Sequence, residues 1–229
     1  MSAAITGIEL CMFDAYGTLF DFNSAVARHR AVIGPKANAL AEMWRNKQIQ
    51  YTWLRNGMNA YAPFWQVTGE ALDHCFRALA IGDRSVREML MGAYLELDSF
   101  PEVPAMLERL GRAGLRAAIL SNGNPDMLDP MVRASGLAER FEAVISVDAA
   151  RVFKVDRRAY ELVEARCGVT PDKVCFLSSN CWDAHGAAHF GFRTVWINRA
   201  GAPDDNLPGS TVAQLKDLAG LPALLGVSS

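Results

Sequence analysis

The hydrophobic pattern divides the chain into three stretches. Residues 8–13 are an apolar run that ends at Asp14 and turns over at Gly17, which is typical of a buried strand followed by a turn. Residues 23–100 contain no convincing strand, and their apolar positions recur at the three- and four-residue spacings of helices. From residue 101 onward, helical patterns alternate with short apolar runs. The pattern therefore predicts one strand, a helical block, and then an α/β alternation.

Local signals place the elements within these stretches. Pro35 suits the first turn of a helix that continues to about Trp53, and Ser85 is the expected N-cap of another helix. Glycines follow four of the later helices, which supports their predicted ends. The predicted helices are 70–80, 85–97, 103–113, 126–134, 158–167, 184–190 and 212–218, and the later strands are 115–120, 141–147, 174–177 and 193–197.

Regular alternation of helix and strand predicts a mainly parallel sheet with right-handed crossovers and helices on both faces. The fold class is therefore α/β, with a Rossmann-like core. The helical block lies between the first strand and the others, so we expect a core domain of residues 1–20 and 101–229 and an inserted all-helical cap domain of residues 21–100.

Composition narrows the range of partners. Of 229 residues, 51% are hydrophobic and 21% charged, as in a globular protein with a sizeable core. A net charge of -2 provides no basic surface for nucleic acid or an anionic membrane, so we expect a small-molecule partner. The five cysteines are odd in number and lack a C-x-x-C pair, and the first residues lack a signal-peptide pattern. We therefore expect reduced thiols and a cytoplasmic location.

Polar side chains gather where the predicted strands end. Each has an ordinary explanation alone: Asp14 and Ser121-Asn122-Gly123 could form turns, Lys154 could be a solvated lysine, and Asp183 could cap a helix. The carboxyl ends of parallel strands, however, meet at one edge of a sheet, where ligands bind. Together they predict a site that contains Asp14, Thr18, Ser121, Asn122, Lys154, Ser178, Asn180 and Asp183.

Four motifs make the pattern recognisable. DAYGTLFD begins at Asp14, LSNG includes Ser121, Tyr160 follows Lys154 by six residues, and SSNxWDAxGA begins at Ser178. Together they resemble the haloacid dehalogenase superfamily, and within it the L-2-haloacid dehalogenase (type II) branch, over essentially the whole chain. Phosphatases of this superfamily carry a second aspartate two residues after the nucleophile. Tyr16 stands there in this chain, and few carboxylates are available for Mg²⁺ near the fourth strand end.

The resemblance implies hydrolysis of short L-2-haloalkanoic acids to D-2-hydroxyacids and halide through an ester on Asp14, without a metal or other cofactor, and commonly in a homodimer. It also assigns roles to individual positions. Asp183 would activate water, Lys154 would balance the two aspartates, and Arg45 with Asn122 would bind the halide. The supporting positions are Ser178, Asn180 and Tyr160 for the hydrogen-bond network, Thr18 and Ser121 for Asp14 and the substrate carboxylate, and Tyr16, Phe64 and Trp182 for an apolar wall.

Some positions depart from the family pattern, and two alternatives stay open. Val155 stands where the family usually has proline, and Asn46 where glutamine is common; Cys181 and His185 replace smaller or less reactive residues. His185 and His189 have metal-ligand spacing on a helix, but no third ligand is evident, so no metal site is predicted. The alternatives are a Mg²⁺-dependent phosphatase of the same superfamily and a non-enzymatic signalling module, although receiver domains are shorter and lack the helical insert.

Overall fold

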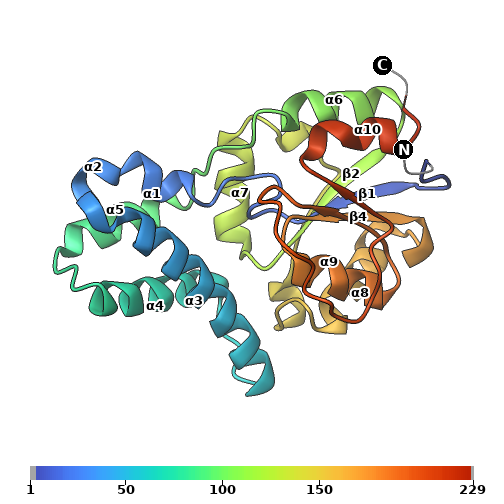
Figure 1. The fold of residues 1–229 in the computed structure, drawn as a ribbon. Coiled ribbons are helices and arrows are strands. Elements are labelled where there is room, and N and C mark those ends of the chain that lie inside the picture. Colours follow the sequence, from blue (N-terminus) through green and yellow to red (C-terminus); the bar gives the residue numbers. More distant parts are fainter. Residues whose placement is uncertain (1–3, 228–229) are drawn as a thin grey trace.

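A computed structural model describes residues 4–227 and contains a six-stranded, fully parallel sheet with helices on both faces (Figure 1). The strand order is β3-β2-β1-β4-β5-β6, so β1 lies in the interior of the sheet between β2 and β4. In this register Phe13, the last residue of β1, pairs with Ile119 on one side and Leu177 on the other. The strands are β1 Leu10–Phe13, β2 Arg116–Ser121, β3 Ala143–Ser146, β4 Val174–Ser178, β5 Arg193–Ile197 and β6 Ala213–Leu215.

Helices α6 and α10 cover one face of the sheet, and α8 and α9 cover the other (Figure 1). Strands β1 and β4 are buried along their whole length, as expected for strands covered on both faces. Helix α8 ends at Cys167, and the Gly168 that follows has a φ of 66°, the left-handed conformation that favours glycine at this position. The helices are α6 Val103–Arg112, α7 Pro125–Ala134, α8 Arg157–Cys167, α9 Cys181–Phe190 and α10 Leu221–Leu224.

Five further helices lie between β1 and α6 in the sequence and form a separate group beyond the end of the sheet where β1 ends (Figure 1). They are α1 Ser24–Arg28, α2 Arg30–Ile33, α3 Ala37–Gly57, α4 Phe64–Ala78 and α5 Arg84–Ala93. The buried stripe of α3 contains Leu40 and Trp44 and then the polar residue Gln48. Within residues 4–227, none of the helices is both long and apolar enough to cross a membrane.

The predicted α/β class and mainly parallel sheet are confirmed, and the division into core and cap domains stays a prediction. Three local predictions were wrong. Helix α4 begins at Phe64, directly after Pro63, and not at residue 70. Asp83, not Ser85, caps α5, because the Asp83 side chain accepts a hydrogen bond from the Ser85 N–H at 2.8 Å. Residues 213–215 form edge strand β6, not a helix.

Candidate active site

Asp14 directly follows β1 and is 5% exposed. Its backbone N–H donates to the Leu177 carbonyl at 2.9 Å, which ties it to the end of β4. Gly17 has a φ of 87°, and a Cβ there would lie 2.9 Å from the Ser179 hydroxyl oxygen. Glycine therefore allows both the turn and the close approach of the segment that follows β4.

The two oxygens of the Asp14 carboxylate have different partners. Oδ2 accepts hydrogen bonds from Asn180 Nδ2 at 2.8 Å, Thr18 Oγ1 at 3.2 Å and Ser178 Oγ at 3.3 Å. Oδ1 accepts one from Lys154 Nζ at 3.0 Å. Oδ2 therefore has three donors for its two lone pairs. Oδ1 has one donor and keeps a free lone pair.

Lys154 joins two carboxylates in the interior. Its Nζ lies 3.0 Å from Asp14 Oδ1 and 2.9 Å from Asp183 Oδ2, and its side chain is 1% exposed. Burial alone would lower the pKa of Lys154, but Asp14 and Asp183 together raise it above its ordinary value. The lysine therefore stays charged and occupies the space between the two carboxylates.

Side chains from two other segments fix the backbone around Lys154. Asn122 Oδ1 accepts a hydrogen bond from the Lys154 N–H at 3.0 Å. Asn56 of α3 pairs with the Phe153 backbone through its Nδ2 at 2.7 Å and its Oδ1 at 2.9 Å. These contacts hold the segment although Val155 replaces the usual proline. The contribution of Asn56 was not predicted, and no local sequence signal marks it.

Asp183 lies in the first turn of α9 and is completely buried. The N-cap position of α9 belongs to Asn180, so the helix-capping explanation of Asp183 was wrong. Its Oδ1 accepts a hydrogen bond from the Tyr160 hydroxyl at 2.8 Å. Burial raises the pKa of Asp183, and Lys154 counteracts this shift. The carboxyl is thus a stronger base than an ordinary aspartate.

Arg45 reaches this centre from α3. Its guanidinium donates to Gln48 Oε1 at 2.8 Å and to Asn180 Oδ1 at 3.1 Å, and it lies 4.7 Å from the centre of the Phe22 ring. Gln48 was missed, although a polar residue in the apolar stripe of a helix is a recognisable signal.

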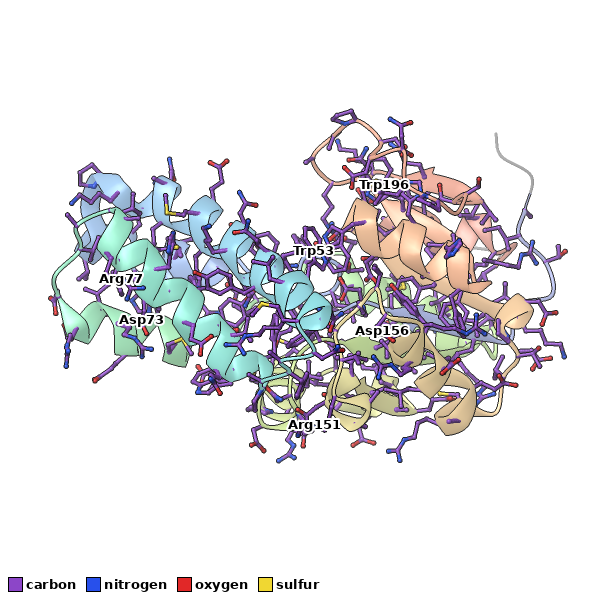
Figure 2. All side chains as sticks on the ribbon, turned by 90° about the horizontal axis from the view of Figure 1, so that it is seen from below. Trp53, Asp73, Arg77, Arg151, Asp156 and Trp196 are labelled. Carbon is purple, nitrogen blue, oxygen red and sulfur yellow. The ribbon has the colours of Figure 1, made fainter. Side chains whose placement is uncertain are left out.

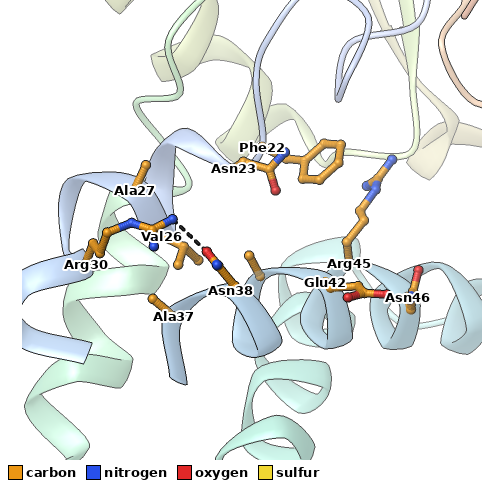
Figure 3. Close-up of a pocket in the computed structure, with 11 residues that line it drawn as sticks. Phe22, Asn23, Val26, Ala27, Arg30, Ala37, Asn38, Glu42, Arg45 and Asn46 are labelled. Atoms are coloured by element: carbon orange, nitrogen blue, oxygen red, sulfur yellow. Dashed lines mark hydrogen bonds between the residues drawn. The ribbon is translucent and has the colours of Figure 1, made fainter. Parts of the chain in front are cut away.

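Arg45 and Asn46 line two cavities, of about 400 and 780 Å³. Figure 3 shows Arg45 extending from its helix toward Phe22 and Asn23 in the smaller one.

The predicted apolar wall is divided between two places. Tyr16 packs against Phe64 and Tyr94, with ring centres 5.8 and 5.4 Å apart. Trp182 of α9 instead packs against Trp53 of α3, with ring centres 5.4 Å apart, and Figure 2 shows Trp53 at the junction between the helical group and the rest of the chain. Trp182 therefore lines the larger cavity beside Arg45 rather than the Tyr16 cluster.

The segment after β2 contributes Ser121 and Asn122. Ser121 is completely buried, and its Oγ accepts a hydrogen bond from the Gly123 N–H at 3.1 Å. The Tyr16 hydroxyl adjoins this turn, because a Cβ on Gly123 would lie 2.8 Å from it. Among residues 4–227, this hydroxyl is the buried side-chain polar atom that lacks a hydrogen-bond partner. Such an atom usually has a partner, so this position suits a ligand that accepts a hydrogen bond.

Comparisons with known proteins identify chains that are similar to this one over most of their length. A (S)-2-haloacid dehalogenase from Pseudomonas sp. (strain CBS-3) is 44% identical over 219 residues, which cover 95% of this chain and 96% of the relative. A dehalogenase structure with an intermediate complex has a TM-score of 0.95 at 41% identity and covers 98% of this chain and 100% of the other.

The structure of L-2-haloacid dehalogenase from Xanthobacter autotrophicus with covalently bound chloropropionic acid has a TM-score of 0.89 at 36% identity and covers 97% and 100% of the two chains. The family model of haloacid dehalogenase-like hydrolases matches residues 8–191, which include β1, the helical group and β4. This chain belongs to the haloacid dehalogenase-like hydrolase family.

Proposed function

We propose that this protein hydrolyses short L-2-haloalkanoic acids to D-2-hydroxyacids and halide through an ester on Asp14. The observation that carries the proposal is the asymmetry of the Asp14 carboxylate: among the described residues, Oδ2 accepts three hydrogen bonds, whereas Oδ1 accepts one, from Lys154. One oxygen is thus held in place while the other keeps a lone pair for attack. Relatives with this activity match almost the whole chain, which supports the assignment.

In the first step, Asp14 Oδ1 attacks C2 of the substrate from the side opposite the halogen. The new C–O bond forms as the carbon–halogen bond breaks, and the bonding electrons leave with the halide. Halide needs no proton, so no general acid is required at the position of Tyr16. Configuration at C2 inverts in this step. Holding the nucleophile and carbon in line supplies much of the rate enhancement.

In the second step, water attacks the Asp14 carboxyl carbon and gives its proton to Asp183. The raised pKa of Asp183, due to burial, suits it to accept this proton. Negative charge develops on Oδ2 in the tetrahedral intermediate. Asn180, Thr18 and Ser178 already donate to Oδ2 and would stabilise that charge, as the donors of an oxyanion hole do. On collapse, the bond between the Asp14 carboxyl carbon and Oδ1 breaks, and Oδ1 takes the proton from Asp183 to become the hydroxyl of the product. The configuration at C2 is unchanged, and the Asp14 carboxyl loses its remaining proton to solvent.

Arg45 is proposed to receive the halide, assisted by Asn122, at the junction between the helical group and the sheet. Its guanidinium contacts Asn180, which also contacts Asp14, so the cation lies one side chain away from the nucleophile. Because Arg45 belongs to α3, we propose that residues 21–100 act as a cap that completes the site. The Lys154 ammonium offsets one of the two buried negative charges and occupies the space between the carboxylates, so a metal ion is not needed there.

The substrate carboxylate is proposed to bind at the turn after β2, where the Ser121 and Tyr16 hydroxyls lie. Replacing Tyr16 with Phe keeps the ring stacked on Phe64 and removes only the hydroxyl. We expect KM to increase about 10-fold, since one hydrogen bond to a charged group is worth roughly 1.5–3 kcal/mol. The measurement is steady-state kinetics on L-2-chloropropionate. Tyr94→Phe, which removes a hydroxyl bonded to Gln48, is the matched control, and an unchanged KM in Tyr16→Phe would contradict this assignment.

A single-turnover reaction in ¹⁸O-water, with enzyme in excess over L-2-chloropropionate, tests the covalent mechanism. The product hydroxyl comes from Asp14 in the first turnover, so we expect unlabelled lactate and ¹⁸O in the peptide that contains Asp14. Enzyme labelled in this way and returned to ordinary water provides the control, because its first product should carry the label. Solvent oxygen in the first product would show direct attack by water.

Halide release is measured with and without a chelator, together with turnover of an aryl phosphate. The proposal expects halide release that a chelator leaves unchanged and no phosphatase activity. Chelator-sensitive phosphate release without halide release would favour the phosphatase alternative.

We further propose that the protein acts in the cytoplasm as a homodimer. The end of α3 exposes three apolar residues, Trp53, Leu54 and Met58, with exposed fractions of 43, 52 and 71%. Exposed apolar clusters commonly mark protein interfaces. We expect sedimentation to give twice the 25.0 kDa mass of one chain. The double variant Leu54→Asp/Met58→Asp should lower it toward a monomer, whereas Val32→Asp, an exposed site on α2, should not.

A further inference from the structure

Three potential metal ligands meet on the side of α9 that faces the loop after β5. Cys181 and His185 are one helical turn apart on α9, and Asp204 comes from the loop. One ligand atom from each lies within 4.8 Å of the others. In a tetrahedral site with metal–ligand bonds of about 2.0–2.3 Å, the ligand atoms lie roughly 3.3–3.8 Å apart. Each of these three ligand atoms would therefore have to move by about 1 Å or less to bind an ion. His189, the partner suggested by the sequence spacing, is exposed and does not belong to this group.

Both ring nitrogens of His185 face oxygen acceptors. Nδ1 lies 2.6 Å from the Gly209 carbonyl oxygen, and Nε2 lies 2.9 Å from Asp204 Oδ1. A neutral imidazole carries one N–H, so it can satisfy only one of the two. If Nδ1 donates to Gly209, the lone pair of Nε2 points at a carboxylate and needs a positive charge between them. A metal-binding histidine characteristically has this arrangement, with its other nitrogen donating to a backbone carbonyl.

The loop is held firmly against α9 at this point. Gly209 has a φ of 93°, and a Cβ there would lie 2.4 Å from the His185 carbonyl oxygen and 2.6 Å from the backbone nitrogen of His189. No other residue fits such a close approach. The position of Asp204 relative to His185 is thus constrained by the backbone a few residues later.

Charge at the cluster also favours a cation. The carboxylates of Asp204 and Asp205 lie beside the Cys181 thiol. A divalent cation is attracted by these carboxylates and stabilises a thiolate ligand. Sulfur, imidazole and carboxylate together form a ligand set that suits zinc.

We propose that Cys181, His185 and Asp204 form a zinc site that links the loop after β5 to α9. The fourth position of a tetrahedral zinc ion would hold water. The site is outside the Asp14, Lys154 and Asp183 network, although Cys181 directly follows Asn180 and the metal would therefore brace the first turn of α9. Its role is structural, and it takes no part in the proposed hydrolysis.

The test is titration of the purified, chelator-treated full chain with Co²⁺ and then Zn²⁺. We expect one Co²⁺ per chain, with the near-ultraviolet charge-transfer band of a thiolate ligand and the visible bands of a tetrahedral ion. Zn²⁺ should remove these bands by displacement and raise the melting temperature. Cys181→Ser should lose the charge-transfer band, and His185→Gln and Asp204→Asn should each weaken Co²⁺ binding at least 10-fold.

Two variants serve as matched controls. His189→Gln alters the next turn of the same helix, and Cys167→Ser removes another partly exposed thiol, so both should bind Co²⁺ as the parent does. Circular dichroism establishes that each variant is folded. Absence of the charge-transfer band from the parent protein, its survival in Cys181→Ser, or equal weakening by His189→Gln would overturn the proposal. An ion pair between protonated His185 and Asp204 would then account for the contacts.

Discussion

Replacing Asp14 with Asn is expected to reduce kcat/KM at least about 10⁴-fold, the order of loss seen when a covalent nucleophile is removed. The amide keeps the size of the carboxylate but lacks its nucleophilic oxygen. The fold should persist, because the other carboxylate beside Lys154, that of Asp183, still neutralises the ammonium.

The dependence of halide release on substrate concentration gives kcat/KM, and thermal unfolding establishes that the variant is folded. Asp21→Asn is the matched control, since Asp21 belongs to the same motif but accepts a hydrogen bond only from the local Asn23 N–H among the described side-chain contacts. It should retain activity within a few-fold. More than a tenth of the parent rate in Asp14→Asn would exclude Asp14 as the nucleophile.

Replacing Lys154 with Met is expected to remove activity and also to lower the free energy of unfolding by about 3–5 kcal/mol. Methionine fills much of the same volume but leaves two buried carboxylates without their shared cation. Urea titration at neutral pH measures the loss. Lys173→Met, which breaks an exposed pair with Glu9, is the control and should cost less than about 1 kcal/mol.

The pH dependence of this variant follows from Asp183. Burial raises the pKa of its carboxyl in the folded parent, and removing the lysine that counteracts this shift raises it further. Folding then favours the protonated carboxyl, so the stability deficit should shrink as pH falls through that raised pKa. The double variant Asp14→Asn/Lys154→Met should recover part of the lost stability, because one buried charge is gone. Two results would contradict this explanation. One is a loss of unfolding free energy in Lys154→Met that does not change with pH, and the other is an equal loss in the double variant.

Part of the candidate site could be predicted from local patterns, whereas Arg45 on α3 and Tyr160 on α8 were assigned only through the family resemblance. Asp14, Ser178 and the Lys154 segment lie at ends of apolar runs, and the parallel topology alone brings them to one edge. What holds these residues was harder to predict. Asn56 contacts Phe153 across 97 positions of sequence, and no local pattern encodes such a pair.

Other misses have different physical reasons. Strand β6 has only three residues, too few to show a period of two, and it is defined by its pairing with β5. The Tyr16 hydroxyl was assigned to an apolar wall because sequence reveals a ring but not whether its polar end finds a partner. Gln48, in contrast, could have been recognised from the sequence, because it is a polar residue in the apolar stripe of α3.

The interior position of β1 has a consequence for how the chain acquires its structure during synthesis. Leu10 pairs with Arg116 on one side and with Val174 on the other, so the first strand made waits for partners synthesised more than 100 and 160 residues later. Closing such long loops costs entropy before any pairing rewards it, and folding is slow when contacts are distant in sequence. The ribosome must therefore synthesise the chain through β4 before Asp14 lies between its two neighbouring strands.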